Sequence, residues 1–130
     1  MSAWRREALG ALPEFKQLIA ASESPMALWI ELHVEFERAF EANDASRVRR
    51  VMEYAKWCWE GRDSDTVNAV GCGFLEHLPE HEGMRARIPE WFSRMDFERL
   101  RPVFAYHAGE AGVTEIEKLY QDPRSAGRSR

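Results

Sequence analysis

The chain has 130 residues, of which 45% are hydrophobic, 12% aromatic and 31% charged, and its formal net charge at pH 7 is −4. This length suits a single domain, and so many aromatic rings exclude a chain that stays disordered, because the rings would remain exposed to water. No apolar run approaches the roughly 20 residues of a membrane-spanning helix, and no apolar block follows the N-terminal charges as it would in a secretory signal. The composition therefore predicts a cytoplasmic protein without a membrane partner.

Helix-forming residues dominate the composition. Alanine and glutamate together number 33, whereas valine, isoleucine and threonine, which favour strands, together number 13. No Asn-Gly, Asp-Gly or Gly-Gly pair separates two alternating apolar runs, so no hairpin is predicted. We expect an all-α fold with one domain over residues 1–122 and a flexible tail over residues 123–130. The domain is expected to be an antiparallel helical bundle or a short α–α superhelix of about six to seven helices.

Capping residues and prolines divide the chain into helices. Ser24 precedes Pro25 and is expected to be the N-cap of a helix that runs to about residue 42, and Asp44 is expected to cap the next helix. Pro79 must end a fourth helix near residue 78, because proline cannot continue an α-helix. The predicted helices span about 13–21, 25–42, 45–60, 65–78, 96–108 and 113–120, with a short turn at 89–92.

Two of these helices have a clear apolar face when their residues are placed at 100° steps. The predicted buried faces comprise Leu28, Trp29, Leu32, Phe36, Ala39 and Phe40 in the first helix, and Val48, Val51, Met52, Tyr54, Ala55, Cys58 and Trp59 in the second. His33 lies at the edge of the first face, with Glu37 one turn on. Trp57 points away from the second face, so either further helices cover it or it belongs to a surface that meets a partner.

The helix predicted over residues 65–78 contains two glycines. Phe74 and Leu78 belong to its apolar stripe, and Gly71 and Gly73 lie within the predicted helix. Each such glycine costs about 1 kcal/mol relative to alanine, so we expect the close approach of a backbone or a tryptophan ring to compensate. This helix is therefore predicted to be central and contacted on both sides.

Five short segments occur in order between residues 47 and 107. They are Tyr54–Cys58, Thr66–Val70, Phe74–Pro79, Ile88–Trp91 and Asp96–Arg101. Together they resemble a family of small all-helical bacterial domains of unknown function. Several members of such families look like immunity proteins, which neutralise a toxin made by the same or a sibling cell. The resemblance implies a helical fold, and it supplies no catalytic residues.

The histidines and the carboxylates beside them are the only candidates for a chemical site. His77 and His81 have the four-residue spacing that places two metal ligands on one helical face, and His107 could complete the set. Pro79 interrupts this geometry, because it places His81 beyond the helix end. Alternatively, His77 interacts with the carbonyls at a helix C-terminus, and Glu80–Gly83 form a solvated turn.

No nucleophile or cofactor motif is recognised. Cys58 lies between two tryptophans on an apolar face, which would raise the pKa of its thiol and make it inert. Gly71-Cys72-Gly73 lies inside a predicted helix and not between a strand and a helix, so it is no phosphate-binding loop. Both cysteines are expected to be reduced core thiols. Neither a catalytic residue nor a cofactor is predicted.

The charge pattern indicates a protein partner. Acidic residues gather on the helix that begins at Pro25, where they would steer the approach of a basic protein, such as a toxin whose own site binds nucleic acid. The predicted partner-binding residues are Glu31, Glu35, Glu41 and Trp57. The basic cluster Arg47–Arg50 could instead simply attract the acidic helix. This cluster is short and flanked by acid, so binding to nucleic acid is not predicted.

Three functions remain open. The first is a noncatalytic protein-binding domain, with an immunity-type inhibitor of a bacterial toxin as its most specific form. The second is a structural or regulatory subunit that self-associates, for example as a homodimer, through exposed aromatic residues such as Trp4 or Trp91. The third is a small metal-dependent enzyme that uses His77, His81 and His107.

Overall fold

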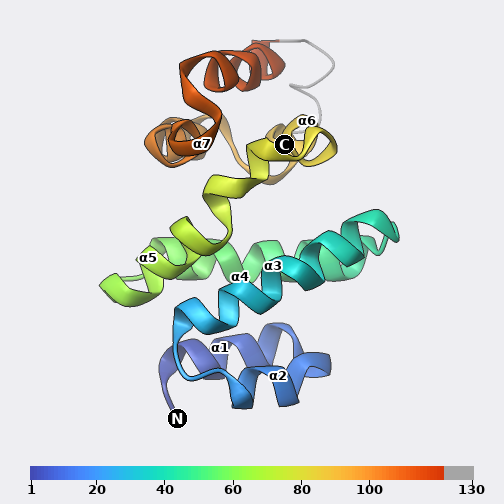
Figure 1. The fold of residues 1–130 in the computed structure, drawn as a ribbon, viewed down its shortest axis with the longest axis vertical. Coiled ribbons are helices and arrows are strands. Elements are labelled where there is room, and N and C mark those ends of the chain that lie inside the picture. Colours follow the sequence, from blue (N-terminus) through green and yellow to red (C-terminus); the bar gives the residue numbers. More distant parts are fainter. Residues whose placement is uncertain (122–130) are drawn as a thin grey trace. The chain divides into compact units, whose positions relative to one another are not determined.

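The computed structural model describes residues 1–121, which form seven α-helices, two short 3₁₀ helices and no strand (Figure 1). The α-helices are α1 (Ala3–Ala11), α2 (Lys16–Ala21), α3 (Pro25–Glu41), α4 (Ala45–Glu60), α5 (Ser64–Gly73), α6 (Glu82–Trp91) and α7 (Arg94–Gln121), and the 3₁₀ helices are η1 (Pro13–Phe15) and η2 (Leu75–Glu80). The predicted all-α fold is confirmed. The tail predicted over residues 123–130 lies outside the described residues.

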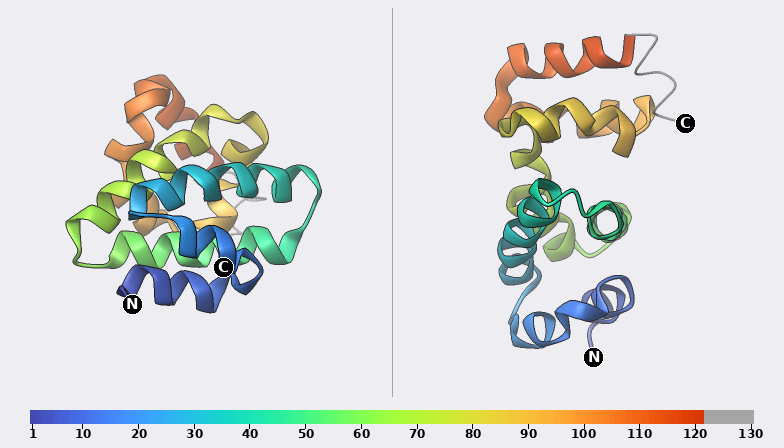
Figure 2. Two further views of the ribbon diagram at one scale, coloured as in Figure 1. Left: turned by 60° about the horizontal axis from the view of Figure 1, so that its bottom comes forward. Right: turned by 90° about the vertical axis from the view of Figure 1, so that its right-hand side faces the viewer.

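The helices form two compact units, one comprising Met1–Phe74 and the other beginning at Leu75. In the first unit, α3 and α4 form an antiparallel pair; α1 packs against α4, and α5 packs against both helices of the pair (Figure 2). In the second unit, η2 and α6 pack against α7 and against each other. Within residues 1–121, no helix combines the length and the apolar character needed to cross a membrane.

Aromatic rings form the centre of the first unit. The indole of Trp29 lies between the rings of Tyr54 and Phe74, with ring centroids 5.3 Å and 4.9 Å away. The predicted inward residues of α3 and α4 are buried, except that Phe40 and Trp59 are half-buried. Burial of these rings removes a large apolar area from water, which is the main favourable contribution to folding.

Ser24 and Asp44 cap α3 and α4 as predicted. The hydroxyl of Ser24 accepts a hydrogen bond from the backbone N–H of Ala27, and the carboxylate of Asp44 accepts one from the N–H of Arg47, both at 3.1 Å. Each bond satisfies an N–H that has no partner within the helix. The starts of these two helices therefore follow from the local sequence.

The sequence predicts no helix before Pro13, but Ala3–Ala11 form α1. The residue at its N-cap, Ser2, makes no side-chain capping bond, so the local signal for this helix is weak. A tertiary contact holds the helix instead, because the buried hydroxyl of Tyr54 donates a hydrogen bond to the carbonyl of Trp4 at 2.9 Å. Packing on α4 thus stabilises a helix that capping alone does not specify.

Glu14 connects η1 to α4. Its carboxylate accepts hydrogen bonds from the guanidinium of Arg50 at 2.8 Å and from that of Arg47 at 3.2 Å. The bond from Arg50 is the largest cause that lowers the pKa of Glu14 to about 2. Arg50 also donates to the carbonyl of Ala11 at 3.1 Å. Two arginines of the basic cluster therefore attach the N-terminal segment to α4.

Helix α5 ends at Gly73, before the predicted end. Phe74 leaves the helix with φ −143° and ψ −65°, and η2 then carries the chain through Pro79. In an α-helix the ring of Pro79 would collide with the carbonyl of Leu75, and Pro79 has no N–H to donate, which explains the change to a 3₁₀ helix. The prediction of one continuous helix over residues 65–78 is therefore wrong.

Both glycines of α5 lie against tryptophans, but at different distances: Gly71 faces the ring of Trp59, as expected for a tryptophan ring, and Gly73 faces Trp29. A Cβ at Gly73 would lie 3.0 Å from the Cβ of Trp29, whereas a Cβ at Gly71 would lie 3.8 Å from the ring of Trp59. The first distance is too short for an ordinary carbon contact and the second is not. Of the two glycines, only Gly73 lies where an added Cβ would crowd a neighbour, and it lies at the end of α5 rather than in the middle of a helix.

Two prolines of the second unit lie inside helices. Pro89, predicted to begin a turn, lies within α6 and is buried with Met84 and Ile88. Burial of this apolar face favours the helix despite the missing N–H of Pro89, so the predicted turn is wrong. Helix α7 continues through Pro102 and bends at Gly109, whose φ is 71° and ψ −179°. The bend separates two segments that the sequence predicts as separate helices.

Ion pairs close the bend in α7. Helix α7 has one arm before Gly109 and a second arm after it. Glu117 in the second arm accepts hydrogen bonds from two arginines of the first arm, Arg101 at 2.7 Å and Arg94 at 3.1 Å. Ile116, beside Glu117, is buried. The two arms of α7 are therefore joined by charge-assisted hydrogen bonds next to an apolar contact.

Candidate functional site

Three apolar side chains are exposed along one side of α3. Met26, Ile30 and Val34 are 37%, 57% and 42% exposed. Their four-residue spacing places them in one row, because residues i and i+4 are neighbours on a helix surface. We call this row the α3 ridge. Contiguous exposed apolar groups are typical of interaction sites, whereas isolated ones are common on any surface.

The three glutamates predicted on α3 have different surroundings. Glu31 and Glu41 are exposed, and no cation of residues 1–121 pairs with either of them. Glu31 flanks the α3 ridge, and Glu41 lies about two turns beyond Val34 on the same side of the helix. Glu35 is half-buried and accepts a hydrogen bond from Arg38 at 2.8 Å. Two of the three predicted carboxylates are therefore open to a partner.

His33 connects α3 to α5. Its Nε2 lies 3.1 Å from the carboxylate of Glu37, and its Nδ1 lies 3.2 Å from the carbonyl of Gly73. The neighbour predicted for His33 one turn along the helix is thus confirmed. Both ring nitrogens are engaged, so His33 has a structural role within the first unit.

Trp57 lies in a hollow away from the α3 ridge. Its indole is 36% exposed and stacks on the ring of Tyr54, with centroids 6.1 Å apart. The hollow has a volume of about 480 Å³ and is lined by Ser2, Ala3, Trp4, Trp57, Gly61, Arg62, Asp63 and Thr66. None of these residues belongs to α3. The hollow that contains Trp57 therefore includes none of Glu31, Glu35 and Glu41, which are predicted to bind the same partner.

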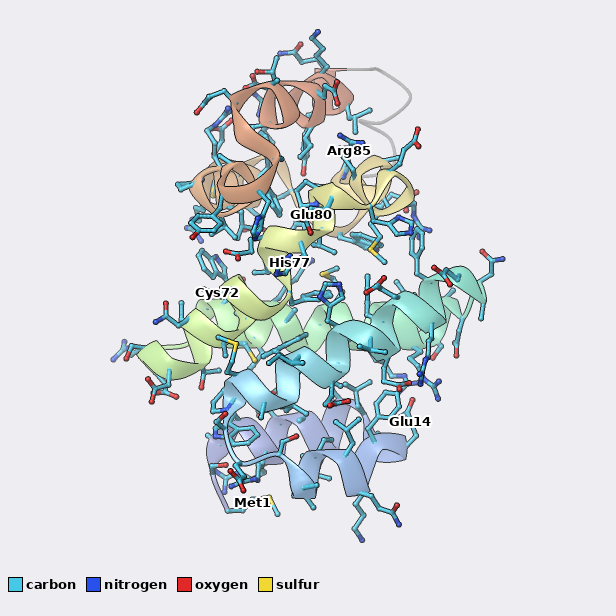
Figure 3. The ribbon with its side chains drawn as sticks, in the orientation of Figure 1. Met1, Glu14, Cys72, His77, Glu80 and Arg85 are labelled. Carbon is cyan, nitrogen blue, oxygen red and sulfur yellow. The ribbon has the colours of Figure 1, made fainter. Side chains whose placement is uncertain are left out.

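Two histidines and two glutamates gather in the second unit. Helix η2 carries His77 and Glu80, which Figure 3 labels, and also Glu76. Helix α7 brings His107 to within 3.0 Å of the carboxylate of Glu76. The imidazole rings of His77 and His107 stack with centroids 4.7 Å apart and planes 24° apart. One ligand atom from each of Glu76, His77 and His107 lies within 4.8 Å of the other two. We call these four residues the η2 cluster.

Of the candidate set His77, His81 and His107, His81 is not part of the η2 cluster, and the interruption expected at Pro79 separates it from His77. His81 is the N-cap of α6, where its Nδ1 accepts a hydrogen bond from the backbone N–H of Met84 at 3.2 Å. The spacing of four residues from His77 would align the two rings only in a continuous α-helix, and η2 is a 3₁₀ helix that ends before His81. Glu76, which the sequence places beside His77, supplies the third potential ligand atom instead of His81.

The two cysteines differ in exposure. Cys58 is buried, and the loss of hydration raises the pKa of its thiol to about 11, as predicted for an inert thiol. Cys72 is exposed, so the prediction of two core thiols is wrong for this residue. The reason is that α5 buries the side that carries Ala69, Val70 and Gly73.

The two tryptophans considered for self-association are largely buried. Trp4 and Trp91 are each 9% exposed, and arginine guanidinium groups lie over both rings. These rings leave little area for a second chain, so the expectation that they are exposed is wrong.

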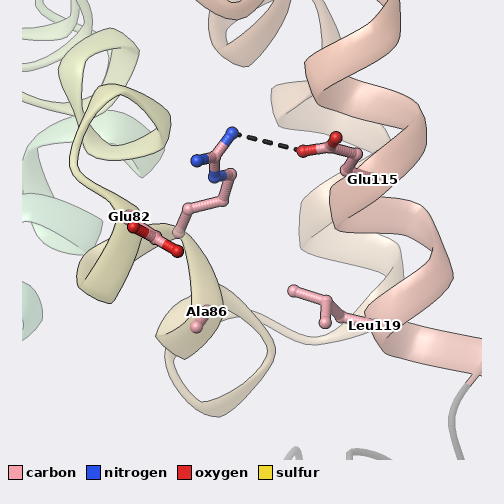
Figure 4. Close-up of a pocket in the computed structure, with 5 residues that line it drawn as sticks. Glu82, Ala86, Glu115 and Leu119 are labelled. Atoms are coloured by element: carbon pink, nitrogen blue, oxygen red, sulfur yellow. Dashed lines mark hydrogen bonds and ion pairs between the residues drawn. The ribbon is translucent and has the colours of Figure 1, made fainter.

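A shallow hollow separates α6 from the second arm of α7 (Figure 4). Its volume is about 210 Å³, and it is lined by Glu82, Arg85, Ala86, Glu115 and Leu119. The guanidinium of Arg85 lies 3.3 Å from the carboxylate of Glu115. Among the described residues that line the hollow, Arg85 is the only cation, and Glu115 offsets its charge. We assign no ligand to this hollow.

These features define a small all-helical domain. The sequence pattern of the domain of unknown function DUF7674 matches residues 5–106, so the chain belongs to this family. The match confirms the resemblance to a family of small domains of unknown function and extends it from about residue 47 back to residue 5. No curated protein and no solved structure matches the chain.

Proposed function

We propose that the protein is a noncatalytic binding domain that uses the α3 ridge, together with Glu31 and Glu41, to bind a basic protein. The observation that supports this proposal is the row of three exposed apolar side chains beside two carboxylates that no cation of residues 1–121 neutralises. Burial of the ridge would supply affinity, because each apolar side chain that leaves water contributes favourably. The carboxylates would increase the rate at which a positively charged partner associates.

The charge of the ridge suggests the class of partner. A protein that acts on nucleic acid presents lysines and arginines to the phosphates, and such a surface is complementary to Glu31 and Glu41. We therefore propose, as the most specific form of this function, an immunity-type inhibitor that neutralises a nucleic-acid-directed toxin in the cytoplasm of a bacterial cell. The resemblance to families with immunity-like members agrees with this form.

A second copy of the chain is the competing occupant of the α3 ridge. A symmetric dimer places the same patch of both copies face to face. The carboxylates of one ridge would then approach those of the other, and like charges that approach without a cation oppose association. The charge pattern therefore favours a basic partner over a homodimer, and sedimentation of the purified protein distinguishes the two.

The proposal is tested by reversing the two charges. The tagged protein is used to capture its partner from an extract of the source cell, the partner is identified and purified, and association rates are measured at low and high salt. We expect Glu31→Lys with Glu41→Lys to slow association about tenfold at low salt and much less at high salt, because salt screens exposed charges. The matched control is Glu7→Lys with Glu110→Lys, which changes the net charge equally at exposed positions of α1 and α7.

Two results would contradict the proposal. Equal association rates for the two double variants would place the binding site elsewhere, and a partner with an acidic binding surface would exclude the charge argument. The immunity form has its own test, in which the identified partner is expressed alone and with the protein. Growth arrest that the protein relieves supports this form, and a harmless partner excludes it.

A further inference from the structure

We propose that the η2 cluster is a binding site for a divalent transition metal, with Zn²⁺ as the ion that fits it best. Glu76, His77 and His107 are the ligands, and Glu80 orients the imidazole of His77. This inference is independent of the partner proposed for the α3 ridge, because the ridge lies in the first unit and the η2 cluster lies in the second.

The local structure of η2 explains how the carboxylates reach both rings. In a 3₁₀ helix, side chains at i and i+3 lie above one another, so Glu80 lies over His77. Nδ1 of His77 is 3.0 Å from Oε2 of Glu80. Helix α7 packs against η2 and supplies His107 from a distant part of the sequence. The site therefore consists of one short segment and one facing histidine.

Each carboxylate faces the same nitrogen of both rings. The Nε2 atoms of His107 and His77 lie 3.0 Å and 3.9 Å from a single oxygen, Oε1 of Glu76. The Nδ1 atoms of the two rings face Glu80, at 3.0 Å for His77 and 3.7 Å for His107. The two rings thus present one edge to Glu76 and the other to Glu80.

Two of these four contacts are hydrogen bonds, one between His77 and Glu80 and one between His107 and Glu76, each at 3.0 Å. A neutral histidine carries one N–H and one acceptor nitrogen, so two neutral imidazoles can satisfy both bonds when His77 carries its hydrogen on Nδ1 and His107 on Nε2. If both rings instead carry the hydrogen on Nδ1, on the side of Glu80, the lone pairs of both Nε2 atoms point toward Oε1 of Glu76. Three acceptors that converge in this way repel one another unless a cation lies among them.

A Zn²⁺ ion fits the distances among these three acceptors. Tetrahedral Zn²⁺ binds histidine nitrogen and carboxylate oxygen at about 2.0–2.2 Å, which separates neighbouring ligand atoms by about 3.3–3.6 Å. The two measured nitrogen–oxygen separations, 3.0 Å and 3.9 Å, lie on either side of this range. Side-chain rotations that turn the two stacked rings toward a common ion would complete the coordination.

The surroundings of the three ligands agree with a metal site. A histidine that binds a metal usually donates its second N–H to a carboxylate, which fixes the orientation of the ring, and Glu80 is placed to accept from Nδ1 of His77 at 3.0 Å. The side chain of Glu76 is 13% exposed, so its carboxylate lies largely out of water where a counter-cation is most favourable. His77 and His107 are 29% and 31% exposed, which leaves a path for the ion and for a fourth ligand such as water.

A pair of hydrogen bonds without a metal is the competing explanation. In that state His77 interacts with Glu80 and His107 with Glu76, each at 3.0 Å. Zn²⁺ binding would replace the hydrogen bond of His107 by coordination of Glu76 and of both rings.

The test uses the full chain, purified without a histidine tag and freed of metal with a chelator. Isothermal titration calorimetry with ZnCl₂ should give one ion per chain, and MgCl₂ should give none, because Mg²⁺ prefers oxygen ligands. We expect Glu80→Gln to weaken Zn²⁺ binding about tenfold or more, as is typical for a residue that orients a ligand. His77→Gln and His107→Gln should cause a larger loss, because each removes a ligand.

The matched control is His33→Gln, which changes a histidine that also pairs with a glutamate but lies outside the η2 cluster. This variant should bind Zn²⁺ as the unaltered protein does. Circular dichroism shows whether each variant keeps its helices, and the graded effect of Glu80→Gln provides a second measurement if one ligand variant does not fold. Co²⁺ in place of Zn²⁺ should give the visible absorption of a four-coordinate site.

Two outcomes would overturn the proposal. The first is that Zn²⁺ binds neither to the unaltered protein nor to His33→Gln, although circular dichroism shows that both are folded. The second is that binding persists in both His77→Gln and His107→Gln. In either case the η2 cluster is a network of hydrogen bonds between histidines and glutamates, and it has a structural role only.

Discussion

The backbone of Gly73 lies so close to Trp29 that a Cβ at position 73 would be 3.0 Å from the Cβ of Trp29. The carbonyl of Gly73 also lies 3.2 Å from Nδ1 of His33. Helix α5 is thus joined to α3 by one close backbone approach and one hydrogen bond at the same residue. This contact positions Phe74, the next residue, against the ring of Trp29.

Alanine substitutions at the two glycines of α5 should have opposite effects. We expect Gly73→Ala to destabilise the protein by about 1–3 kcal/mol, because the added methyl group forces Trp29 and the end of α5 apart. Gly71→Ala should stabilise it by up to about 1 kcal/mol, because its Cβ has room beside Trp59 and alanine favours the helix. Urea denaturation measures both. Equal effects of the two substitutions would show that α5 does not pack as described.

Removal of the Tyr54 hydroxyl should loosen α1. This hydroxyl donates a hydrogen bond to the carbonyl of Trp4, and burial raises the pKa of Tyr54 far above its usual value. Tyr54→Phe leaves the ring in place but leaves the carbonyl without this donor, at a cost of about 1–2 kcal/mol. Thermal unfolding measures this loss, with Tyr106→Phe as the control because Tyr106 is 74% exposed. A similar melting temperature for both variants would argue against the contact.

Acid should weaken the attachment of the N-terminal segment. The pKa of Glu14 is lowered from about 4.5 to about 2 in the folded protein, chiefly by Arg50. Ionised Glu14 therefore stabilises the fold above pH 4.5, and this contribution disappears as the pH falls toward 2. The three side chains are partly exposed, so water limits the contribution to about 1 kcal/mol.

The substitution Glu14→Gln tests this pH dependence. It should lower the free energy of unfolding at pH 7, and the difference from the unaltered protein should vanish near pH 2. Glu110→Gln, at an exposed position of α7, serves as the control and should show no such trend. A constant difference between pH 7 and pH 2 would exclude the ion pairs of Glu14 as its cause.

The two thiols should differ in reactivity toward a disulfide reagent. Cys72 is exposed and should react in the folded protein, whereas Cys58 is buried with a raised pKa and should react roughly tenfold or more slowly. The absorbance of the released thiolate measures both rates. Cys72→Ser should remove the fast phase, and Cys58→Ser should leave it. A single slow phase for both thiols would contradict the exposure of Cys72.

Local signals in the sequence predict much of the first unit. Ser24 and Asp44 specify the starts of α3 and α4 because each supplies the capping oxygen itself. The apolar periodicity of both helices likewise predicts which residues are buried. Helix α1 is missed because it has no capping bond and depends on a hydrogen bond from Tyr54, far away in the sequence.

The η2 cluster shows why a site is harder to predict than a helix. The spacing of His77 and His81 suggests a shared face, but Pro79 changes the helix type between them. His107 is brought in by the packing of α7 on η2, which no local pattern encodes. The α3 ridge is missed for another reason, since Ile30 and Val34 are apolar residues whose exposure depends on which helices cover α3.

The bend at Gly109 limits how far the protein can be shortened. The family pattern ends at residue 106, yet the arm of α7 beyond the bend buries Val113 and Ile116 and places Tyr120 on the ring of Phe97. A fragment trimmed at the family boundary would lack this arm, and the apolar groups that the arm covers, such as the ring of Phe97, would be exposed to water. It would be prone to aggregation, and the smallest stable form of the protein must include the second arm of α7.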